Sequence, residues 1–128
     1  MPCGYVIDKE RRLVRSTCSG HLTFADAKAH QDKLSKDPDF VPDFNQLLDL
    51  TGVTSLDIST EEAKMIARGT LFFSPPSRRA WVASDPLVFG MARLVEAYRE
   101  MAGAREEFRV FYDRAEALRW IGTDGDVG

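Results

Sequence analysis

The sequence predicts a single-domain α/β fold in which a mixed, mostly parallel five-stranded sheet is flanked by about four helices. Its 128 residues are enough for one core, because a chain of this size removes roughly two thirds of its unfolded surface from water. Hydrophobic residues make up 44% and charged residues 29% of the chain, as in folded globular domains. Short β-rich segments alternate with amphipathic ones, which is typical of parallel strands connected by helices.

An antiparallel hairpin is expected at the start of the chain. Residues 4–8 (GYVID) and 13–19 (LVRSTCS) are β-rich and flank a charged KERR segment, and Gly20 is expected to end the second strand. If the hairpin turns midway through that segment, residues whose numbers sum to 21 face each other, so Cys3 lies opposite Cys18. This pairing permits a disulfide under oxidation, but a cytosolic setting favours two reduced, partly buried thiols.

A helix and a buried strand come next. Thr23 precedes the helical stretch from Phe24 to about Lys36, and Asp26 occupies its third position. The apolar run Asn45–Leu50 (NQLLDL) is typical of a central strand, which we expect to end there and to be followed by a loop.

A second helix is expected to start near Thr60. Ser59 is followed three residues later by Glu62, which is the spacing of a capping box. The two prolines of the segment SPPSRR then interrupt helical structure, and residues 79–83 (RAWVA) are predicted to return to the sheet as a fourth strand.

The last predicted elements are two helices around a fifth strand. Asp85 followed by proline is a helix start, and apolar residues then recur at helical spacing. Phe108–Phe111 (FRVF) is predicted to be a strand, and Asp113 to cap the final helix. The domain is expected to span residues 1–122, with residues 123–128 as a flexible tail.

Composition and motifs argue against several functional classes. The formal net charge is -3 with acidic and basic residues intermixed, so nucleic-acid binding is not expected. The chain has no run of about 20 apolar residues, so no transmembrane segment is expected and a cytoplasmic location fits best. Neither GxGxxG nor GxxxxGK[ST] occurs, so the sequence predicts no nucleotide cofactor.

Motifs for metal binding and catalysis are also missing. His21 and His30 have no partners at ligand spacing, so no metal is expected and both histidines are expected at the surface or at a cap. No GxSxG elbow occurs, and the sequence favours a protein that is not an enzyme. A catalytic site assembled only in space remains an alternative.

Ser59 is the first candidate functional residue. It is predicted at the N-terminus of a helix that follows a central strand, where free N–H groups and the helix dipole favour an added phosphate. A phosphorylation switch is one interpretation. The other is a plain N-cap serine that contributes about 1 kcal/mol to helix stability.

An aromatic group is the second candidate. Phe72 and Phe73 precede two prolines, and Phe89 lies off the main apolar stripe of its helix. Together with Met91 they could form a partner surface or a groove for an apolar small molecule. The alternative is that they cover the edge of the core.

Residues 49–60 (DLTGVTSLDIST) are similar to the strand-loop-helix segment of STAS domains. Residues 79–99 and 108–122 resemble the SpoIIAA-like group, also described as STAS/Sec14-like. By position, Asp57 matches the motif aspartate and Ser59 the serine that phosphorylating relatives modify. This chain departs from the DSSG motif that is usual in these relatives. Isoleucine replaces the serine before Ser59, and Thr60 replaces the glycine after it.

The resemblance implies a non-enzymatic regulatory or protein-interaction module that contacts an unidentified protein partner through the loop containing Asp57, Ser59 and Thr60. The alternative function, from the Sec14-like side of the resemblance, is binding of a small apolar, lipid-like molecule. Exposed aromatic residues and the edge of the N-terminal hairpin are available for a homodimer, but the sequence does not fix the oligomeric state.

Overall fold

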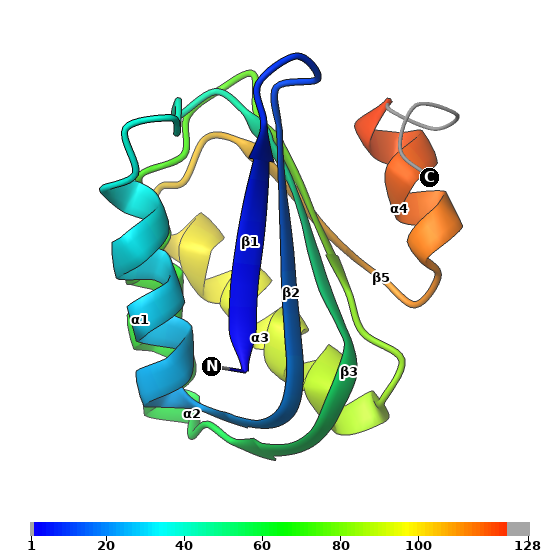
Figure 1. Ribbon diagram of the computed structural model, residues 1–128. Coiled ribbons are helices and arrows are strands. Elements are labelled where there is room, and N and C mark those ends of the chain that lie inside the picture. Colours follow the sequence, from blue (N-terminus) through cyan, green and yellow to red (C-terminus); the bar gives the residue numbers. More distant parts are fainter. Residues whose placement is uncertain (1, 123–128) are drawn as a thin grey trace.

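A five-stranded sheet in the order β1-β2-β3-β4-β5 organises the chain (Figure 1). The structure is a computed structural model that describes residues 2–122, so the expected tail of residues 123–128 lies outside it. The strands are β1 (Cys3–Asp8), β2 (Leu13–Thr23), β3 (Asn45–Asp57), β4 (Arg78–Val82) and β5 (Glu107–Phe111). The helices are α1 (Phe24–Ser35), α2 (Thr60–Gly69), α3 (Pro86–Met101) and α4 (Arg114–Ile121).

The sheet is mixed and mostly parallel. Strand β1 pairs antiparallel with β2, and the other three neighbouring pairs are parallel. A helix lies in the connection between each pair of parallel neighbours, because a parallel pair cannot be joined by a tight turn. The predicted fold class is confirmed.

The N-terminal hairpin has the predicted register, with Cys3 opposite Cys18. The two cysteines form a disulfide, with Cα atoms 4.1 Å apart, so the expectation of free thiols is wrong. Both side chains point into the core, where they are 9% and 4% exposed. The register brings the two sulfur atoms together, as the predicted pairing of Cys3 with Cys18 permits.

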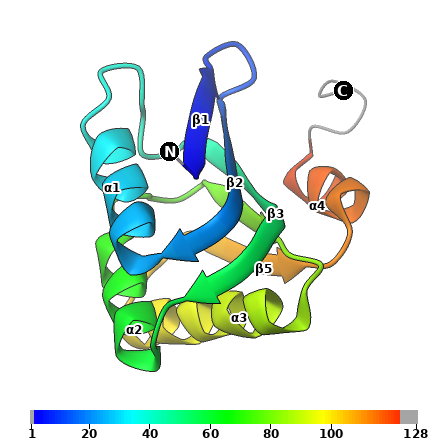
Figure 2. The same ribbon diagram turned by 60° about the horizontal axis from the view of Figure 1, so that its bottom comes forward.

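Strands β2 and β3 are longer than predicted. Gly20 does not end β2, and Leu50 does not end β3. The two strands pair along their whole length with register shifts near Gly20, whose φ of +71° lets the strand bend without ending. Figure 2 shows the extended ends of both strands curving toward the side of α1 and α2. Asp57 is therefore the last residue of a strand and not part of a loop.

The helices form two unequal layers. Helices α1, α2 and α3 lie on one side of the sheet and α4 lies on the other (Figures 1 and 2). Strand residues alternate between them: Leu48 packs in the cluster containing α2 and α3, while Leu47 packs against α4. The three-helix side holds most of the core.

All four helices begin where the sequence predicts. The N-cap residues are Thr23, Ser59, Asp85 and Asp113, and each side chain accepts a hydrogen bond from a backbone N–H of the first turn. These bonds satisfy donors that have no partner within the helix.

Candidate functional site

Ser59 lies exposed between the end of β3 and the start of α2. Its Oγ accepts from the Glu62 N–H at 3.1 Å, and the Glu62 carboxylate accepts from the Ser59 N–H at 2.9 Å. The predicted capping box is thus present. Asp57 and Thr60 are exposed on either side, so the three residues expected to form the contact loop do lie together at the surface.

A surface groove runs from this site across to α3. It has a volume of about 340 Å³. Its lining is mostly apolar and includes Leu56, Ile58, Ala63, Leu87, Met91 and Leu94. Ser59 and Thr60 also line it, at the start of α2. Leu87 is 67% exposed, so the groove leaves a large apolar side chain in contact with water.

The four residues predicted as one aromatic surface do not form one. Phe73 and Met91 are buried, and Phe89 packs away from them on Tyr112, with ring centroids 3.8 Å apart. Phe72 is half-buried and stacks on Phe73. Packing separates them, because residues 72 and 73 close one edge of the core, while Phe89 lies on the side of α3 that meets the end of β5.

A small internal cavity of about 40 Å³ lies between the sheet and helices α1 and α2. Phe72, Phe73 and Met91 line it, whereas Phe89 does not. The other apolar lining residues include Leu22, Leu34, Leu48, Leu50, Ile66 and Trp81. Five polar side chains also reach it: His30, Gln31, Gln46, Thr70 and Arg79.

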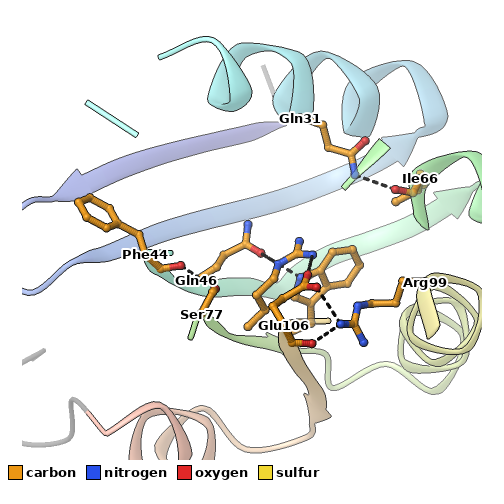
Figure 3. A network of polar contacts seen from close by, with 9 residues as sticks. Gln31, Phe44, Gln46, Ile66, Ser77, Arg99 and Glu106 are labelled. Atoms are coloured by element: carbon orange, nitrogen blue, oxygen red, sulfur yellow. Dashed lines mark hydrogen bonds and ion pairs between the residues drawn. The ribbon is translucent and has the colours of Figure 1, made fainter. Parts of the chain in front are cut away.

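Arg79 carries a positive charge into this core. Its side chain is 1% exposed; Nε donates to Gln46 Oε1 at 3.0 Å and Nη1 donates to Glu106 Oε2 at 3.1 Å. Arg99 pairs with the other oxygen of the same carboxylate at 3.0 Å and also donates to the Glu106 carbonyl. Figure 3 shows Gln46, Arg99 and Glu106 in this network. Burial lowers the pKa of Arg79 to about 10, so the side chain remains charged at neutral pH.

The buried cluster holds more positive than negative charge. Arg79, Arg99 and Glu106 are all at most 3% exposed, so two cations share one carboxylate. The guanidinium carbon of Arg79 lies 4.1 Å from the ring centroid of Phe73, which offers a favourable cation–π contact but no negative charge.

His30 is buried, so its expected surface position is wrong. It is 8% exposed, Nε2 lies 3.1 Å from Ser16 Oγ, and the ring meets Tyr5 edge-on. Burial, followed by the charges of Arg79 and Lys33, lowers the pKa of His30 to about 4. The imidazole is therefore neutral at pH 7. His21 does lie at the surface, with Nδ1 2.7 Å from Ser55 Oγ.

Thr70 contributes a buried hydroxyl without a partner. It follows the last residue of α2, its side chain is fully buried and it lines the cavity. Its Oγ1 has no hydrogen-bond partner among the described residues. Such groups are rare in folded proteins, since an unsatisfied buried hydroxyl costs roughly 1–3 kcal/mol.

The comparisons with known proteins concern the fold. No protein-family model matches the chain, and no curated protein matches it. Among solved structures, it is similar to an uncharacterized protein of the DUF3478 family from Shewanella loihica PV-4, described as having a SpoIIAA-like fold. The TM-score is 0.59 at 18% identity, and 93% of each chain is covered. The chain has a SpoIIAA-like fold. The resemblance drawn from residues 79–99 and 108–122 is confirmed at this level.

Within this SpoIIAA-like fold, the exposed position of Ser59 was expected, whereas the groove beside it and the polar cavity were not. One signal for the cavity was available in the segment RRAWVA, where Arg79 and Trp81 are two apart and so share one face of a strand. A charged residue on the inward face of a central strand indicates a buried charge.

Residues 2–122 contain no cluster of three or more histidine, cysteine or acidic side chains that could hold a metal ion. Their helices are too short or too polar to cross a membrane.

Proposed function

We propose that this protein is a non-enzymatic interaction module that docks the apolar face of a partner protein's helix in the groove between α2 and α3. The observation that carries the proposal is the groove itself, which places apolar side chains beside Ser59. A helix laid in such a groove buries its own apolar face against the lining, which is a common way for one protein to recognise another.

Ser59 is placed to control this docking. A phosphate on its Oγ would add a charge of about -1.5 to -2 at the edge of the apolar lining. A bound partner would have to strip water from that charge, and Asp57 and Glu61 already make the surroundings acidic. Phosphorylation is therefore expected to release the partner while leaving the capping residues in place.

The test compares three variants as bait in extracts of the native host. Ser59→Asp adds a charge, and Ser59→Asn is its neutral control of the same size; both keep a good N-cap. Leu87→Glu places a carboxylate on the exposed wall of the groove. We expect wild type and Ser59→Asn to retain the same partner, and Ser59→Asp and Leu87→Glu to lose at least about 90% of it.

Two results would contradict the proposal. If Ser59→Asp and Ser59→Asn capture the partner equally, a negative charge at Ser59 does not control docking. If Leu87→Glu captures the partner at the wild-type level, the groove is not the docking site. Circular dichroism of each variant checks that the fold is intact.

The alternative function, binding of a lipid-like molecule, has less support. The internal cavity of about 40 Å³ is far smaller than the 300–1,000 Å³ typical of pockets for drug-sized ligands. Dimerisation through the edge of β1 stays a prediction.

A further inference from the structure

The internal cavity combines three features that the groove and its function do not explain. Its lining is largely apolar, but the lining residues include Arg79, whose guanidinium is buried, and Thr70, whose buried hydroxyl is unsatisfied. The last two features are each unfavourable for a folded protein, because charges and hydroxyl groups lose hydration when buried. Because these groups line the same cavity, we infer that a bound ligand offsets the charge and satisfies the hydroxyl.

The charges favour an anion. The buried cluster contains Arg79 and Arg99 but only one carboxylate, that of Glu106, so one positive charge is uncompensated within it. Two of the five N–H groups of Arg79 are used by Gln46 and Glu106. A guanidinium with unused donors binds carboxylates through short, charge-assisted hydrogen bonds.

The neighbouring polar groups suit the same ligand. Thr70 Oγ1 can donate a hydrogen bond to an anion, and this would satisfy it. His30 is neutral at pH 7, so it neither repels an anion nor supplies a second cation. The other titratable groups near Arg79 are Glu106, which is held by both arginines, and Arg99.

The volume limits the size of the ligand. A cavity needs roughly 10–15 Å³ to hold one water molecule, so 40 Å³ holds about three water-sized groups. Formate and acetate, with three and four non-hydrogen atoms, are of this size. We propose that the cavity between the sheet, α1 and α2 is a binding site for a small carboxylate of this kind, held by Arg79 and Thr70.

The test follows ligand binding through Trp81, which lines the cavity. The sequence has two tryptophans, so Trp120→Phe leaves Trp81 as the single fluorescent tryptophan. Sodium acetate is titrated at constant ionic strength, and acetamide serves as the neutral molecule of the same shape. We expect a saturable fluorescence change with acetate and at least tenfold weaker binding of acetamide.

Two substitutions test the assigned side chains in the same background. Thr70→Val keeps the shape and removes the hydroxyl, so it should weaken acetate binding about tenfold without lowering the unfolding temperature. Thr54→Val, at an exposed position of β3, is the matched control and should bind as wild type. Arg79→Met should abolish binding, and it leaves Arg99 and Glu106 as a neutral pair. If Arg79→Met does not fold, Thr70→Val tests the site without it.

The size limit is tested by a series of longer acids. Affinity should fall from acetate to butyrate and vanish with octanoate. The proposal is overturned if acetate and acetamide bind alike, if Thr70→Val binds acetate as wild type does, or if octanoate binds more tightly than acetate. A crystal structure grown in acetate that has only water in the cavity would also overturn it.

Discussion

His30 shows how packing changes the chemistry of a single residue. An exposed histidine titrates near pH 6.5, but His30 lies between the sheet and α1 with Tyr5 against its ring. Loss of hydration penalises its charged form, and Arg79 adds repulsion, so its pKa falls to about 4. Protonation below neutral pH therefore favours the unfolded chain.

The lowered pKa of His30 makes the stability of the protein depend on pH. Between about pH 6.5 and pH 4 the unfolded chain binds a proton at this position and the folded chain does not, so stability decreases as the pH falls through that window. The loss amounts to about 3 kcal/mol at most. We expect His30→Gln to flatten the stability curve between these pH values, measured by urea unfolding. His21→Gln, at an exposed position, should leave the slope as in wild type; a wild-type slope in His30→Gln would contradict the assignment.

At the scale of elements, the bend in β2 positions the candidate site. Strands β2 and β3 run past the end of β4, and their paired extension carries Asp57 to the start of α2. Gly20 allows this extension because its φ of +71° is strained for residues with a Cβ. If β2 ended at Gly20, the end of β3 that leads to Ser59 would have no neighbouring strand to pair with.

Gly20→Ala should therefore destabilise the protein by about 1 kcal/mol through backbone strain. Nothing lies within 4 Å of the added Cβ, so no steric clash contributes. Gly4→Ala in β1 is the matched control, because its Cβ also meets open space and its backbone is not left-handed. Chemical unfolding of both variants measures the difference, and equal stabilities would show that Gly20 has no special backbone role.

At the scale of the whole molecule, one buried ion cluster joins three elements. Glu106 precedes β5, Arg79 lies in β4 and Arg99 lies in the last turn of α3. The carboxylate is 1% exposed and bonds both guanidinium groups. A buried charge that loses its partner keeps the full cost of its lost hydration, so the cluster depends on this one residue.

Glu106→Gln is expected to cost about 3–5 kcal/mol, because it leaves two buried cations without a carboxylate. Glu107→Gln, one residue later, is the control: Glu107 pairs with Arg78 at 2.9 Å, but the two side chains are 59% and 46% exposed. That change should cost less than about 1 kcal/mol. Thermal and urea unfolding measure both losses, and similar losses in the two variants would show that the buried cluster does not hold these elements together.

The sequence by itself determined those features that depend on residues close together in the chain. The hairpin register placed Cys3 opposite Cys18, and the spacing of Ser59 and Glu62 predicted the capping box at α2. Alternating strand and helix patterns predicted the order of the elements. These signals are local, because caps and periodic faces involve neighbours within a few positions.

Only the tertiary structure decided which distant side chains meet. Arg79 and Glu106 are 27 residues apart, His30 and Ser16 are brought together by the packing of α1 on β2, and Thr70 lines a cavity formed by several elements. The hydrogen bonds and the volume of that cavity depend on how the layers pack. No spacing along the chain encodes them, because contact energies between distant residues exist only once the sheet and helices have assembled.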